Sequence, residues 1–214
     1  MKRHDFTLVE LLMAIGIIVI LAAISIPTAL SAIKKAETAK AQAEMTALVT
    51  ALKNYESTYG FLPREFVIKE DRPLSESLQE FGYEGEKVYK GFIEVLQGEN
   101  HNVGNRNMNP RKLAFLEIQG NTKGVYEDPW GNNYVVFLDG DGDGKITLDE
   151  SLDWKDDYRL NVEGDALHQS ILIISKGPDG ILGGKSEKPS QARDNVLSIP
   201  VIWDKSEETW VISH

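Results

Sequence analysis

Residues 6–26 read FTLVELLMAIGIIVILAAISI and form one long apolar stretch near the amino terminus. Glu10 is its only strongly polar side chain, beside thirteen Leu, Ile, Val and Phe residues. A helix of this length rises ~1.5 Å per residue and spans about 31 Å, which matches the hydrocarbon core of a bilayer. Glu10 costs about 3 kcal/mol at mid-membrane, whereas each large apolar residue favours insertion by about 0.3–0.6 kcal/mol. The stretch therefore predicts a membrane-spanning helix.

A basic leader, residues 1–5 with Lys2 and Arg3, precedes this stretch, and the boundary reads Asp5-Phe6-Thr-Leu-Val-Glu. This order resembles the prepilin signal shared by type IV pilins and type II secretion pseudopilins, a family whose helix usually carries a proline where Pro27 stands. The resemblance implies that a prepilin peptidase cuts between Asp5 and Phe6 and that the new amino terminus is methylated. The family has Gly, sometimes Ala, before the Phe. Asp5 therefore predicts slow or absent cleavage, because a pocket shaped around Gly has little room for a carboxylate.

Glu10 has two interpretations. Thr7 and Glu10 fit a Ser/Thr-x-x-Glu capping box, in which Glu10 bonds to a backbone N–H at the start of the helix. The resemblance implies instead an assembly role, in which Glu10 pairs with the free amine of Phe6 on a neighbouring copy and so offsets the cost of a carboxylate in lipid. An ordinary secretory signal peptide is the alternative for the whole segment, but its apolar core would be only ~7–15 residues long.

Charge and composition limit the partners. The 214 residues have a formal net charge of −10, which argues against nucleic acid, whose phosphates require clustered Lys and Arg. No cysteine is present, so extra stabilisation of the head must come from packing or from a metal ion. The four histidines show no metal-binding spacing and no phosphate-binding glycine loop follows a strand, so no enzyme is predicted.

Residues 28–59 contain neither Pro nor Gly and predict that the helix continues as an amphipathic stalk over 27–60, with Gly60 as its stop. An apolar stripe at three- and four-residue steps should pack on the sheet of the head; its members are Met45, Leu48, Val49, Leu52, Tyr55 and Tyr59. Residues 54–63 resemble the segment that ends the long helix of major pseudopilins.

The head, residues 61–214, is predicted to be α+β. Short helices are expected near Leu74 to Phe81 and near Tyr89 to Leu96, and a polar surface loop over 98–109, while 110–118 fits helix and strand equally. Short strands with antiparallel pairing are expected at 134–138, 146–148, 170–175, 196–203 and 209–212. The run 128–134, DPWGNNY, resembles the DPWG-x-x-Y hallmark of the major type II secretion pseudopilin, and 64–124 is longer than that family leads us to expect.

Residues 139–150, DGDGDGKITLDE, match a twelve-residue calcium loop. The predicted metal ligands are Asp139, Asp141, Asp143, Lys145, Thr147 and Glu150, with Gly144 at the sharp turn. The preceding residues suggest a strand, so we expect a calcium loop between strands and not a helical EF-hand. The alternative is an acidic turn that only adds solubility.

A second calcium site is implied by resemblance alone. Residues 175–180 and the Gly183-Gly184 pair resemble the glycine-rich calcium loop of the family, which places ligands at Asp179 and Asp194 near the backbone oxygens of Lys176 and Ile181. A plain hairpin turn is the alternative for this segment.

These features predict a pilin-like fold: a long N-terminal helix, half membrane and half amphipathic, on a small antiparallel sheet with calcium-type loops. The resemblance implies a pseudopilus subunit of the bacterial inner membrane, with its amino terminus cytoplasmic and its head outside. The implied partners are copies of itself in a helical filament, minor pseudopilins, the prepilin peptidase and the secretion assembly machinery. A surface type IV pilus subunit is one alternative, and a membrane-anchored calcium-dependent binding protein or enzyme is another.

Overall fold

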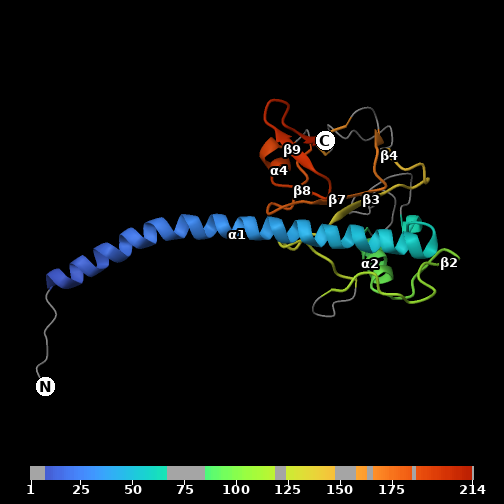
Figure 1. The fold of residues 1–214 in the computed structure, drawn as a ribbon, viewed down its shortest axis with the longest axis horizontal. Helices are drawn as coiled ribbons and strands as arrows, with labels where there is room; N and C mark the ends of the chain where they lie inside the picture. Colours follow the sequence, from blue (N-terminus) through green and yellow to red (C-terminus); the bar gives the residue numbers. More distant parts are fainter. Residues whose placement is uncertain are drawn as a thin grey trace, which may run out of the picture. The chain divides into compact units, whose positions relative to one another are not determined.

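The computed structural model describes residues 8–66, 85–118, 124–147, 158–162, 166–184 and 187–213. The chain divides into two compact units, Met1–Ala39 and Lys40–His214. Helix α1, Leu8–Tyr59, contributes residues to both (Figure 1).

In the first unit, α1 exposes its large apolar side chains, including Leu12, Ile18 and Ile24. Among the described residues this is the one helix long and apolar enough to cross a membrane, and its most apolar window is not buried within the protein. Pro27 lies inside the helix and does not end it. The prediction of a long apolar N-terminal helix is confirmed, and its length fits a membrane span or a signal anchor.

In the second unit, the rest of α1 forms one side of the core. The predicted stripe is confirmed, because Met45, Leu48, Leu52 and Tyr55 are buried, and Val49 and Tyr59 pack against the same cluster. The predicted stop is also confirmed. Gly60 has a φ of 78° and its N–H donates to the Glu56 carbonyl over 2.7 Å, a helix end that favours glycine.

Two short elements follow α1. The 3₁₀ helix η1, Arg64–Phe66, is followed along the chain by α2, Gly85–Leu96, which confirms the helix predicted near Tyr89. Its side chains Tyr89, Phe92, Ile93 and Leu96 join the core cluster of α1. The helix predicted near Leu74 to Phe81 lies outside the described residues.

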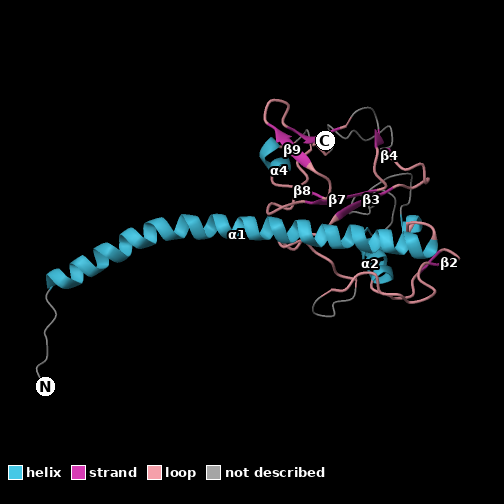
Figure 2. Cartoon of the chain, in the orientation of Figure 1, coloured by secondary structure: helices cyan, strands magenta, loops and turns pink. Residues whose placement is uncertain are grey.

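The central sheet has the order β3-β7-β8 and is antiparallel throughout (Figure 2). Its strands are β3 (Val135–Leu138), β7 (Ile171–Ser175) and β8 (Val196–Leu197). One face, with Val136 and Ile173, packs in the cluster that holds α1 and α2. The other face, with Phe137 and Leu172, packs in a second cluster beneath the C-terminal strands. Burial on both faces explains why β3 and β7 are almost wholly apolar.

A second three-stranded sheet has the order β5-β10-β9, from β5 (Leu160–Asn161), β10 (Thr209–Ile212) and β9 (Val201–Asp204). Two-stranded pairs join β1 (Asn102–Val103) to β2 (Arg106–Asn107) and β4 (Ile146–Thr147) to β6 (Ala166–Leu167). A helix, α4 (Pro189–Arg193), precedes β8. The long helix packed on small antiparallel sheets gives the predicted α+β layout, although β5 and β10 pair in parallel.

Three predictions require correction or completion. The single strand expected over 196–203 is wrong: β8 and β9 belong to different sheets, and Pro200, which has no N–H to donate, precedes β9. The polar loop expected over 98–109 contains the β1–β2 hairpin, and its last residue, Asn109, is buried. The Asn109 side chain explains that burial, because its amide donates to the carbonyls of Val95 and Leu113. Residues 110–118 form neither helix nor strand.

Candidate metal sites

The acidic loop, residues 139–145, connects β3 to β4. Asp139 directly follows the buried strand β3, is only 2% exposed, and continues the ladder through an N–H donated to the Ser170 carbonyl over 2.9 Å. At the far end Ile146 is fully buried in the second cluster. Both ends of the loop are therefore fixed by the core. The expected strand–loop–strand arrangement is confirmed over this range.

Carboxylates converge in the acidic loop. Asp139, Asp141 and Asp143 each present an oxygen, and these oxygens lie within 4.8 Å of one another. The two Asp139 oxygens accept the N–H groups of Gly142 and Gly144, the latter over 2.9 Å. Gly144 has a φ of 84°, so the sharp turn suits glycine there. Three carboxylates this close repel one another, and an oxygen-seeking divalent cation such as calcium would relieve the repulsion.

The remaining predicted ligands of this loop are only partly described. Lys145 donates its backbone N–H to Asp143 over 2.8 Å, and Thr147 is exposed on β4. Glu150, the predicted bidentate ligand, lies outside the described residues. The structure thus brings three of the predicted ligands together, and calcium binding by the loop stays a prediction.

The second predicted site lies between β7 and β8, where Asp194 caps the C-terminus of α4. One carboxylate oxygen of Asp194, Oδ1, is buried and has no hydrogen-bond partner within the described part of the chain. The side-chain oxygen of the next residue, Asn195, is in the same state. Burial, together with the charge of Asp179, raises the pKa of Asp194 to about 6. An unpartnered buried oxygen is costly, and a cation bound between Asp179 and Asp194 would satisfy the one on Asp194.

Asp128 links the DPWG turn to this second site. It is 4% exposed; its Oδ1 accepts the N–H groups of Trp130 and Asn132, and its Oδ2 accepts the Ser175 hydroxyl over 2.6 Å. Asn132 in turn donates to the Gly177 carbonyl over 3.2 Å. The turn residues of this sequence predict the DPWG turn, but the bond from Asp128 to the end of β7 depends on the tertiary fold.

Arg159 is a positioning residue that the sequence does not reveal. It is 8% exposed, has a φ of 50°, and its Nε donates to the Gly183 carbonyl over 2.7 Å. Its other guanidinium nitrogens donate to the carbonyls of Gly184, Glu187 and Glu208. Gly183 also lies against the backbone of Ala192 in α4, where an added Cβ would clash with the Ala192 nitrogen. Arg159 therefore holds the segment between Asp179 and Asp194 in place.

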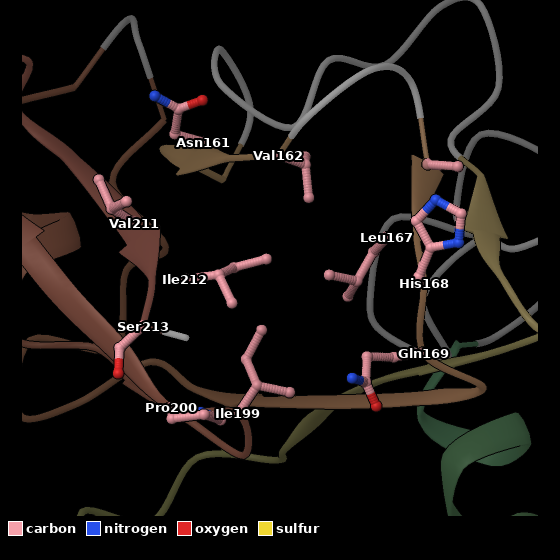
Figure 3. Close-up of a pocket in the computed structure, with 11 residues that line it drawn as sticks. Asn161, Val162, Leu167, His168, Gln169, Ile199, Pro200, Val211, Ile212 and Ser213 are labelled. Atoms are coloured by element: carbon pink, nitrogen blue, oxygen red, sulfur yellow. The ribbon is translucent and has the colours of Figure 1, made fainter.

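A cavity of about 600 Å³ lies elsewhere in the second unit, beside β6 and the C-terminal sheet. In Figure 3 the side chains of Leu167, Ile199 and Ile212 point into it. Among the described lining residues His168 is the one titratable side chain, so the cavity offers little for acid–base chemistry. The full lining consists of Asn161, Val162, Ala166, Leu167, His168, Gln169, Ile199, Pro200, Val211, Ile212 and Ser213.

No family model, no curated protein and no solved structure matches this chain.

Proposed function

We propose that this chain is a structural subunit of a type II secretion pseudopilus, a membrane-stored protein that assembles into a helical filament and drives protein export. One observation carries the proposal: helix α1 joins an exposed, membrane-length apolar segment to a segment whose side chains form the core of a small α+β head. A core helix of a soluble protein would bury its most apolar part, whereas α1 buries its less apolar part. The prepilin-like start of the sequence supports the same function.

Assembly in this proposal uses the first unit. The apolar half of α1 resides in the inner membrane until neighbouring helices replace lipid around it in the filament. Once cleavage before Phe6 has freed its amine, Glu10 pairs with that amine on the next copy, a contact that gives register as well as charge compensation. The force comes from a cytoplasmic assembly ATPase, minor pseudopilins join the filament, and this chain itself breaks no bond.

Calcium stabilises the head in this proposal. The acidic loop and the Asp179–Asp194 site take oxygen ligands from segments that connect sheet strands, so a bound ion would fix those connections. Outside the cytoplasm many proteins are stabilised by disulfides, but this sequence has no cysteine. Bound calcium would stabilise the fold of the head in their place.

Deletion of the gene in its own host tests the function. The proposal predicts that secreted proteins accumulate in the periplasm and that a plasmid copy of the wild-type chain restores export. Loss of long extracellular filaments, with export intact, would support a surface pilus instead. Loss of one substrate-specific activity, with export and filaments intact, would refute a mechanical role and support an anchored enzyme or binding protein.

A further inference from the structure

Arg64 lies directly against the acidic loop. A Cβ added at Gly142 would be 2.5 Å from Arg64 Nη1, 2.9 Å from Nη2 and 3.1 Å from Cζ. The guanidinium group therefore covers the backbone of the loop between Asp141 and Asp143. Gly142 has a φ of 90°, a backbone conformation that favours glycine.

The backbone around Arg64 is well fixed. Leu62 and Phe66 are buried, and the Arg64 N–H donates to the Leu62 carbonyl over 2.7 Å. The Phe66 ring contacts the Phe92 ring of α2, with centroids 6.0 Å apart. Arg64 thus reaches the acidic loop from η1, just after the end of α1, and both segments belong to the second unit.

The position of the Arg64 side chain is energetically unfavourable. Its Nε is buried and has no hydrogen-bond partner within the described residues. None of the ion pairs found among those residues joins Arg64 to a carboxylate of the loop. An unpartnered N–H is unfavourable, and the attraction between the guanidinium charge and three nearby carboxylates acts over a longer distance than a direct ion pair.

We propose that Arg64 is a fixed internal cation that sets the affinity and the charge selectivity of the acidic loop for metal ions. The inference rests on the calcium site proposed above. Without metal, the Arg64 charge reduces the repulsion among Asp139, Asp141 and Asp143. When a cation binds among these carboxylates, the same charge repels it, so the loop binds metal more weakly than its carboxylates alone would allow.

Coulomb's law gives the size of the effect. In a water-like dielectric, a unit charge within about one Debye length of the ion, ~8 Å at physiological salt, weakens binding of a divalent ion roughly three- to tenfold. Repulsion is proportional to the charge of the ion, so a trivalent ion is weakened roughly five- to thirtyfold. Arg64 therefore favours divalent over trivalent cations. By thermodynamic linkage, metal binding must weaken the interaction between Arg64 and the loop by the same factor.

Titration calorimetry of the full chain in detergent micelles tests the inference, with Ca²⁺ and Tb³⁺ as probes. Asp141→Ala identifies the binding step that belongs to the loop. Arg64→Gln removes the charge, Arg64→Lys keeps it, and Arg111→Gln removes an equal charge at an exposed position outside the loop. We expect Arg64→Gln to bind Ca²⁺ three- to tenfold more tightly and Tb³⁺ by a larger factor, with Arg64→Lys and Arg111→Gln within about twofold of wild type.

Structural damage would weaken binding, which is opposite to the expected direction. Equal or weaker Ca²⁺ binding by Arg64→Gln, beside a wild-type loop that binds Ca²⁺, would overturn the role of Arg64 and leave the calcium site intact. A rise in the Ca²⁺ and Tb³⁺ affinities of Arg64→Gln by equal factors would also overturn the role of Arg64 and leave the calcium site intact. If every binding step of the wild type is also present in Asp141→Ala, the proposed calcium site is refuted, and the role of Arg64 is refuted with it.

Discussion

Replacing Tyr134 with Phe removes one hydroxyl group that ties the central sheet to helix α1. Tyr134 is fully buried next to β3, and its hydroxyl donates to Glu44 Oε2 over 2.7 Å. Burial and the bond to Glu44 raise the pKa of this hydroxyl, so it stays a donor at all ordinary pH values. Glu44 also pairs with Lys40, whose Nζ lies 3.7 Å from Oε1.

The size of the loss follows from the acceptor. A hydrogen bond to a charged group contributes about 1.5–3 kcal/mol. The Glu44 side chain is 23% exposed, so water can solvate it again after the change, and we expect a loss near 1.5–2 kcal/mol in the free energy of unfolding. For a domain of this size each kcal/mol shifts the thermal midpoint by about 2–4 °C, which gives a fall of about 3–8 °C.

A double-mutant cycle separates this bond from general damage. Tyr134→Phe, Glu44→Gln and the double variant are compared by thermal unfolding of the full chain in detergent. Tyr126→Phe is the matched control, because its hydroxyl donates to the Glu44 backbone carbonyl over 2.9 Å and not to the carboxylate. We expect Tyr134→Phe and Glu44→Gln to couple by about 1 kcal/mol and Tyr126→Phe and Glu44→Gln to add. Additive effects for Tyr134→Phe and Glu44→Gln would refute a charge-assisted bond, because a glutamine at position 44 still offers an acceptor oxygen without the charge.

Two further predictions concern calcium and processing. With a Kd of ~0.1 mM, Ca²⁺ at ~1 mM would raise the free energy of unfolding by about 1.4 kcal/mol. The thermal midpoint should therefore rise with Ca²⁺ and hardly change with Mg²⁺, and in Asp141→Ala it should no longer respond to Ca²⁺. A wild-type midpoint that does not respond to Ca²⁺ would leave the loop as an acidic turn. Asp5→Gly should accelerate cleavage before Phe6, measured by the mass of the amino terminus over time, and equal rates for both chains would show that Asp5 is no obstacle.

Local sequence patterns predicted the parts of the fold that local physics decides. Helix α1 follows from a run of good helix formers, its end from Gly60, and its buried stripe from the spacing of residues such as Leu48 and Leu52. The acidic loop follows from alternate carboxylates between two apolar segments, and its three first carboxylates do converge.

Contacts between distant segments decided the rest. An arginine in sequence predicts a solvated side chain, yet Arg159 is buried because four carbonyls from two other segments converge on it. Nothing local distinguishes Arg64, whose position over Gly142 arises only when the end of α1 packs near the β3–β4 connection. The division of 196–203 into β8 and β9 likewise depends on which sheet each half joins, although Pro200 was a usable signal.

Filament assembly by Glu10→Ala tests the central claim most directly. The full chain is produced with its assembly machinery, filaments are imaged by electron microscopy with an antibody against the head, and the membrane fraction is assayed in parallel. Removing a carboxylate from an apolar segment favours insertion, so the variant should reach the membrane in wild-type amounts. The account predicts labelled filaments from the wild type and none from Glu10→Ala. Wild-type filament yield from Glu10→Ala, or no filaments from either chain, would contradict it.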